Sequence, residues 1–133
     1  MSRRWLLVLG SNLDGDRTLR EGLSALSALG VVEPLTAVVR TPARQGGGRY
    51  HNAIASLRCG LDEEALRVAL KAIEARLGRV RDGRAEVALD IDPLAVDEGA
   101  GWREGAHARA KGELRRDPVP ALLALAGVQV ATA

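Results

Sequence analysis

Two aspartates separated by one residue stand in an apolar stretch of the chain, Leu89-Asp90-Ile91-Asp92. Because side chains alternate between the two faces of a β-strand, a strand here places both carboxylates on one face and both apolar side chains toward the core. Two carboxylates this close repel each other, and a divalent cation held between them relieves that repulsion. By spacing alone, a strand with one solvated polar face is the commoner explanation, so both interpretations stay open at this point.

The composition is that of a globular protein that is large enough to have a core. Of its 133 residues 47% are hydrophobic and 27% are charged, and we expect a single domain over residues 1–133. Aromatic residues make up only 2% and the formal net charge is +2, which indicates neither a base-stacking surface nor a broad basic one. We therefore expect no nucleic-acid partner.

The chain shows no sign of a membrane segment or a disulfide framework. Cys59 is its only cysteine, and the apolar run at residues 5–9 is too short for a signal peptide and ends in Gly10-Ser11-Asn12. No stretch is long enough to cross a bilayer. We expect a cytoplasmic protein without a membrane partner.

The hydrophobic pattern predicts four strands that alternate with two helices. Strand-like segments cover residues 5–9, 31–39, 52–59 and 87–92. One helix carries leucines at helical spacing between Leu19 and Leu29, and the other begins at the N-cap residue Asp62 and runs to Leu77. The order βαββαβ is that of the ferredoxin-like fold, in the α+β class.

The pattern weakens after Pro93, where we expect a C-terminal extension of loop and helix. Residues 99–111 are small and polar, which favours a loop, and Asp117-Pro118 begins a short final helix. The apolar residues of this end could pack internally or against a second copy, so we expect a monomer or a weak dimer. They are Leu122, Leu123, Leu125 and Val128.

Five short motifs follow one another along the chain. They are Leu9-Gly10-Ser11-Asn12-Leu13, Arg40-Thr41-Pro42, Tyr50-His51-Asn52-Ala53, Ile73-Glu74 with Gly78-Arg79-Val80-Arg81, and Leu89-Asp90-Ile91-Asp92. Each is weak alone, but in this order and spacing they resemble the 6-hydroxymethyl-7,8-dihydropterin pyrophosphokinases of folate biosynthesis. The resemblance covers about residues 5–96.

The resemblance implies a ferredoxin-like core and a transferase reaction. The family transfers pyrophosphate from ATP, its co-substrate, to the hydroxymethyl oxygen of the pterin and releases AMP, so ATP and a pterin would be the small-molecule partners. Its Asp-x-Asp pair binds two magnesium ions, which makes Asp90 and Asp92 the implied metal ligands and catalytic residues. Carboxylate oxygens suit Mg²⁺, and metal ions neutralise the charge that develops in phosphoryl transfer.

The resemblance also implies residues for the ATP site, namely Glu74, Arg79, Arg81 and His107, and Arg84 is added as a hypothesis because it could compensate for a lost family residue. Glu74 could equally be a solvated carboxylate of the helix, and His107, which follows Ala106 where the family has proline, an ordinary loop histidine. Arg79 matches a Gly-Arg step of the family and is the third implied catalytic residue, because a guanidinium can hold two phosphate oxygens at once. Basic residues at a helix end also commonly complement the helix dipole, which is the alternative for Arg79 and Arg81.

Tyr50 and Asn52 match the family's contacts to the pterin, and Thr41 aligns with a further residue on the pterin side. Asn12 reads as a turn-forming residue that could also line the pterin pocket. A pterin needs an aromatic face for stacking and amide-type groups for its polar edge. Without the resemblance, Tyr50 would be a partly buried anchor beside a loop and Asn52 a turn residue.

Two departures from the family pattern leave a second function open. Glu86-Val87-Ala88 stands where the family has a Pro-Arg step, and Arg84 lies close enough in sequence to compensate. The family also stacks its pterin on a late phenylalanine, whereas this chain has no phenylalanine and carries Arg115-Arg116 in that region. The alternative is a degenerate homologue that binds nucleotide or pterin as a regulator or binding module without turnover.

Overall fold

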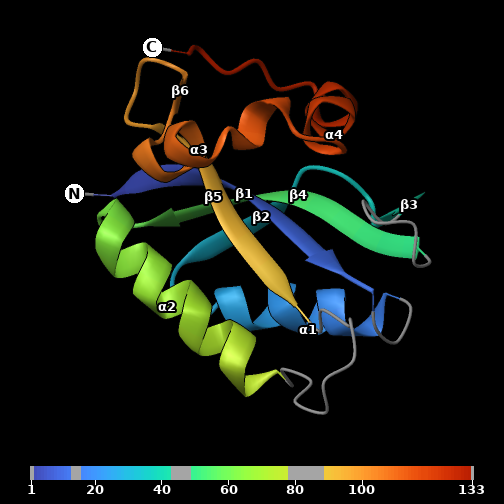
Figure 1. Ribbon diagram of the computed structural model, residues 1–133. Coiled ribbons are helices and arrows are strands. Elements are labelled where there is room, and N and C mark those ends of the chain that lie inside the picture. Colours follow the sequence, from blue (N-terminus) through green and yellow to red (C-terminus); the bar gives the residue numbers. More distant parts are fainter. Residues whose placement is uncertain (1, 13–15, 43–48, 78–88, 133) are drawn as a thin grey trace.

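The computed structural model describes residues 2–12, 16–42, 49–77 and 89–132, and these form one antiparallel sheet with helices on both faces (Figure 1). The strands are β1 (Arg3–Ser11), β2 (Val31–Pro34), β3 (Val39–Pro42), β4 (Arg49–Cys59), β5 (Asp90–Asp97) and β6 (Trp102–Glu104). Their order across the sheet is β2-β4-β1-β5-β6, and β3 also pairs with β4. The predicted α+β class is confirmed.

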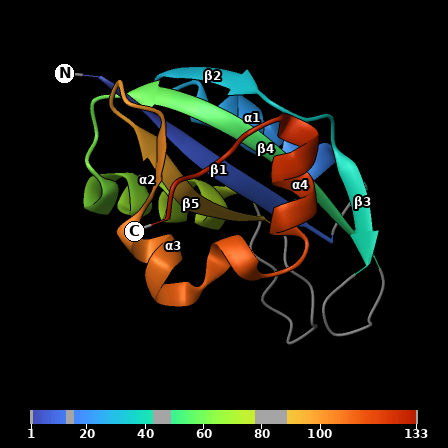
Figure 2. The same cartoon turned by 90° about the horizontal axis from the view of Figure 1, so that it is seen from above.

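The helices form two layers. Helices α1 (Arg17–Leu26) and α2 (Glu63–Arg76) cover one face of the sheet. The C-terminal segment covers the other face with α3 (Ala106–Lys111), the single turn η1 (Glu113–Arg115) and α4 (Val119–Ala126), as Figure 2 shows from above. No helix among the described residues has the length and apolar character needed to cross a membrane.

Strand β1 lies in the middle of the sheet and is buried on both faces. Leu7 and Leu9 belong to the core under α1 and α2, whereas Leu6 and Val8 belong to the core under the C-terminal segment. This two-sided burial explains why residues 5–9 read as a continuous apolar run and not as an alternating one. The paired strand β4 places Ala53, Ala55, Leu57 and Cys59 in the first core, as their alternation predicted.

Helix α2 follows its sequence signals closely. The side chain of Asp62 accepts a hydrogen bond from the Ala65 backbone N–H at 2.9 Å, as expected of an N-cap. Leu66, Leu70 and Ile73 form its buried stripe. The predicted helix is therefore confirmed, with Leu77 as its C-cap residue.

The expected single strand over residues 31–39 is two strands. After β2 the backbone N–H groups of Leu35 and Thr36 both donate to the carbonyl oxygen of Ile54, at 2.8 and 3.2 Å. The Thr36 hydroxyl in turn accepts a hydrogen bond from the Ile54 N–H at 3.0 Å. These contacts interrupt the regular pairing with β4, which resumes at Val39 as β3.

The prediction of a loop over residues 99–111 is wrong, because this stretch contains β6 and α3. Contacts distant in sequence hold both elements: β6 pairs with β5, and the Gly105 N–H donates to the Leu94 carbonyl at 3.0 Å. Strand β5 also continues past Pro93 to Asp97, whereas residues 87–88 of the predicted strand lie outside the described residues. The final helix, α4, is confirmed.

We predict that Gly30→Ala destabilises the protein by about 2 kcal/mol or more, because a Cβ there would overlap the backbone carbonyl of Arg58 in β4. Urea unfolding followed by circular dichroism measures the change. Ala28→Ser, at an exposed position two residues earlier, is the control and should be close to neutral. Equal stability of the two variants would contradict the close approach of this turn to β4.

Candidate functional site

The two aspartates lie together on one face of β5. Leu89 and Ile91 are buried in the core under α1 and α2. Asp90 is paired in register with Gly10 and Asp92 with Val8, whose side chain lies on the face covered by the C-terminal segment. The alternation predicted for Leu89-Asp90-Ile91-Asp92 is thus confirmed.

The environment of Asp92 disfavours a second negative charge. Burial, followed by the charge of Asp90 and a hydrogen bond with its side chain, raises the pKa of Asp92 to about 8, and the charges of Glu113 and Glu74 act in the same direction. The ordinary value is 3.8. A cation bound beside such a carboxyl group would favour its ionised form.

The donor chemistry of this pair fits Mg²⁺. Carboxylate oxygens are the ligands that this ion prefers, and it is commonly held by one or two carboxylates together with waters and substrate phosphates. In the part of the chain that the structure describes, no group of three or more His, Cys, Asp or Glu side chains is placed to hold a metal ion. The remaining coordination positions would therefore go to water and to a bound phosphate ligand.

Glu74 fixes the strand between the two aspartates. Its side chain is buried on α2, and Oε2 accepts a hydrogen bond of 2.7 Å from the backbone N–H of Ile91. The resemblance implied a contact to the nucleotide for Glu74. The structure shows a contact to the backbone of β5 between the two aspartates, and the nucleotide contact stays a prediction.

His107 reaches the aspartates from α3. Its Nε2 lies 3.7 Å from Oδ1 of Asp92, and 13% of its side chain is exposed. Burial lowers the pKa of His107, and the positive charge of Arg67 lowers it further. The structure thus brings His107 beside the carboxylate pair and favours the neutral imidazole, and the nucleotide contact that the resemblance implied for His107 stays a prediction.

Glu63 at the start of α2 holds α3 in place. Its two carboxylate oxygens accept hydrogen bonds from the backbone N–H groups of Ala106 at 3.2 Å and His107 at 2.8 Å. The N-cap residue of α3 is Gly105, which has no side chain to accept a hydrogen bond from the first turn. Glu63, from a distant element, accepts those hydrogen bonds instead. A Cβ at Gly105 would lie 3.2 Å from the Glu63 carboxylate, which favours glycine there.

The four residues expected to bind the pterin gather at one end of the sheet. Thr41 on β3 pairs with Tyr50 on β4, the Asn52 Nδ2 donates to the Thr41 hydroxyl at 2.6 Å, and Asn12 follows the end of β1. Cross-strand register also places Asn52, Gly10 and Asp90 in one row over three neighbouring strands. Since directly paired residues share a face, this polar group lies on the same face as the aspartates.

Gly10 keeps the middle of that row free of a side chain. A Cβ at this position would lie 3.1 Å from Oδ1 of Asn52 and 3.7 Å from the ring of Tyr50. The row therefore has a polar amide at one end, a carboxylate at the other and only backbone between them.

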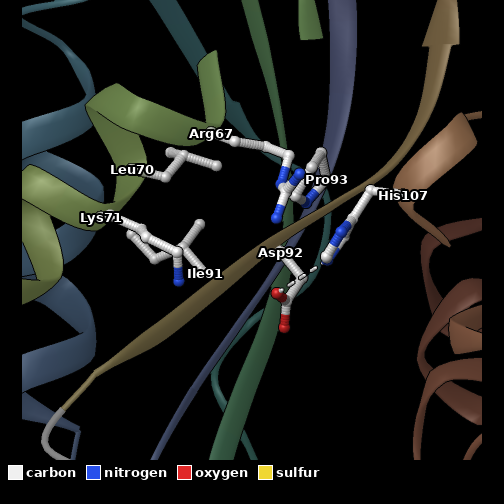
Figure 3. A pocket seen from close by; sticks show the side chains of 7 residues that line it. All are labelled: Arg67, Leu70, Lys71, Ile91, Asp92, Pro93 and His107. Atoms are coloured by element: carbon white, nitrogen blue, oxygen red, sulfur yellow. Dashed lines mark ion pairs between the residues drawn. The ribbon is translucent and has the colours of Figure 1, made fainter. Parts of the chain in front are cut away.

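Two basic residues of α2 complete the surroundings of Asp92. Figure 3 shows Arg67 and Lys71 together with Asp92 and His107 around one small pocket beside β5. Sequence reasoning missed Glu63, Arg67 and Lys71, since charged residues on a helix ordinarily indicate only its solvated face. The predicted site residues Arg79, Arg81 and Arg84 lie outside the described residues.

An α+β domain with a carboxylate pair, a neighbouring cationic helix face and a polar sheet end is suited to a metal–phosphate ligand and a second small molecule. A sequence model of the 7,8-dihydro-6-hydroxymethylpterin-pyrophosphokinase (HPPK) family matches residues 6–125. Because the match spans most of the chain, the protein belongs to this family. The match extends beyond the five motifs into the C-terminal segment, and no curated protein sequence matches the chain.

We predict that Asp92→Asn stabilises the metal-free protein at pH 8 by ~1–3 kcal/mol, because it removes a disfavoured charge. Since the folded pKa of Asp92 lies above its ordinary value, the wild-type protein should lose stability as the pH rises from about 4 to about 8, and the variant should lose less. Urea unfolding at several pH values tests this. Glu64→Gln, at an exposed acidic position of α2, is the control, and an equal pH dependence in all three proteins would contradict the prediction.

We predict that Glu63→Ala loosens α3 and lowers the free energy of unfolding by about 1–2 kcal/mol, because two helix N–H groups lose their acceptor. Amide hydrogen exchange at Ala106 and His107 should become faster. Glu64→Ala changes the neighbouring charge in the same turn of α2 and should leave both amides protected. Unchanged exchange in Glu63→Ala would show that α3 is held by other contacts.

Proposed function

We propose that this protein transfers pyrophosphate from ATP to the hydroxymethyl group of 6-hydroxymethyl-7,8-dihydropterin in a magnesium-dependent reaction of folate biosynthesis. The observation that carries the proposal is the row of Asn52, Gly10 and Asp90 across three strands. It brings the polar group expected to seat an acceptor beside the carboxylates expected to hold the metal ions. We also assign the succession β1-α1-β2-β4-α2-β5 to the ferredoxin-like arrangement.

On the acceptor side, Tyr50 would provide the face for stacking and Asn52 the amide that reads the polar edge of the pterin. The hydrogen bond to Thr41 fixes the Asn52 amide, so that its Nδ2 is engaged and its Oδ1 lies toward the space over Gly10. Because the Asn52 Oδ1 is already oriented as a hydrogen-bond acceptor, little side-chain entropy would be lost when the substrate binds. Asn12, which is partly buried, would border the same end of the sheet.

On the donor side, Asp90 and Asp92 would hold two magnesium ions. When bound, such ions neutralise the charge on the transferring phosphates and orient the reacting groups. Glu74 would hold the edge of β5 between the two carboxylates through its bond to Ile91, and His107 would border the site from α3. Arg79, Arg81 and Arg84 remain our candidates for further phosphate contacts.

A second candidate function is nucleotide or pterin binding without turnover. It is favoured by the sequence Glu86-Val87-Ala88 in place of the family's Pro-Arg step and by the lack of phenylalanine. Both candidates require ATP binding, so nucleotide-dependent thermal stabilisation does not separate them. The release of AMP does.

We predict that the protein releases AMP from ATP and Mg²⁺ only when the pterin is present, and that Asp90→Asn and Asp92→Asn each lower the rate about 100-fold or more. Chromatography of the nucleotides measures the product. Glu64→Gln serves as the control and should retain wild-type turnover. ATP binding without AMP release in the wild-type protein would favour the binding function, and full turnover in both aspartate variants would contradict the proposed metal ligands.

A further inference from the structure

Arg67 and Lys71 stand one helical turn apart on α2 and share one face of that helix. In Figure 3 both side chains extend toward the edge of β5, where Asp92 and His107 complete the lining of the pocket. Arg67 is partly buried and Lys71 is exposed. Two cations thus lie on the side of Asp92 opposite to the row that leads to Asn52.

The sheet is open at this point. Strand β6 pairs only with Ala95, Val96 and Asp97 of β5, so among the described residues no strand covers the outer edge of β5 at Ile91 and Pro93. At this edge the Ile91 N–H donates to the Glu74 carboxylate, and Pro93 has no N–H that would need a partner. Side chains from α2 can therefore reach around this edge to the face that carries Asp92.

The two cations differ in their contacts from other basic residues of the described part of the chain. Among the described residues, the side chains of Arg67 and Lys71 form no hydrogen bond or ion pair, whereas Arg103 and Arg116 pair with Glu98 and Glu113. Among the described residues, acidic and basic groups thus line one pocket without forming an ion pair between Asp92 and the two cations.

Such a separation suits a ligand that carries both signs of charge. A metal-bound phosphate chain presents its cation to carboxylates and its oxygens to basic side chains. An arginine can hold two phosphate oxygens with its planar fork, and a lysine adds a mobile point charge.

We propose that Arg67 and Lys71 form a phosphate-binding pair that holds the polyphosphate of the nucleotide on the α2 side of Asp92. The identity of the ligand as a nucleotide rests on the function proposed above. The presence of an anion subsite does not, and it can be tested with inorganic pyrophosphate.

The experiment is isothermal titration of the full chain with magnesium pyrophosphate, ATP and adenosine. We expect Arg67→Gln and Lys71→Gln each to raise the Kd for pyrophosphate and ATP about tenfold or more, and the Kd for adenosine less than twofold, because adenosine carries no phosphate. Arg67→Lys should recover part of the affinity, since it keeps the charge and loses the fork. Both positions are on the surface of α2, so the variants should fold, which circular dichroism checks.

Arg76→Gln is the matched control. Arg76 is exposed on the same helix, nine residues from Arg67 and therefore on the opposite side of α2. The Arg76→Gln variant should bind all three ligands as the wild-type protein does.

Three results would overturn the inference: wild-type protein that binds neither pyrophosphate nor ATP, equal loss in the Arg76 control, or a loss of adenosine affinity as large as that of ATP. The last result would place the base or ribose beside α2. Loss of pyrophosphate binding in the Arg67 and Lys71 variants, together with wild-type protein that releases no AMP, would support the subsite and contradict the proposed reaction.

Discussion

The buried carboxylate of Glu74 accepts the backbone N–H of Ile91, and the geometry of the site depends on this contact. It joins α2 to the open edge of β5 at the residue between the two aspartates. Because strand side chains alternate, the burial of Ile91 in the core under α1 and α2 places Asp90 and Asp92 on the other face. The hydrogen bond from Ile91 to Glu74 joins α2 to the strand between them and holds the helix close to the acidic groups. The energetic cost of burying the Glu74 carboxylate is offset because the carboxylate accepts the hydrogen bond from the Ile91 N–H.

The site stores unfavourable electrostatic energy that a ligand can relieve. Asp92 is partly buried beside Asp90, and the charges of Glu113 and Glu74 also oppose its ionisation. A fold selected only for stability would place an amide or an apolar residue there. Local conflict of this kind is expected where a protein binds a charged ligand, since the ligand supplies the missing partner. The raised pKa of Asp92 and the lack of hydrogen-bond and ion-pair partners for Arg67 among the described residues occur at the same pocket, where one ligand could interact with both groups.

Local sequence patterns predicted the elements whose own residues determine them. Strand β4, helix α2 and the alternation around Ile91 were read correctly because apolar spacing and the Asp62 cap act over a few residues. Helix α3 was not, because its six residues have no side-chain cap of their own and depend on Glu63, more than forty residues away. The row of Asn52, Gly10 and Asp90 likewise requires the strand register, which no single segment contains.

The resemblance names residues that are expected to face the ligands, whereas the structure adds residues that hold these elements in place. Glu63 and Arg67 lie on the same helix, and in the sequence alone both look like ordinary charged residues of its solvated face. In space one carries α3, and with it His107, to the site, and the other brings a cation to the edge of β5. Electrostatic stabilisation of a phosphate depends on the distance and orientation of the charges, not on the element that carries them. In the proposed reaction, Arg67 and Lys71 of α2 would therefore supply positive charge across the edge of β5, in a chain that has Glu86-Val87-Ala88 where the family has an arginine before the aspartates.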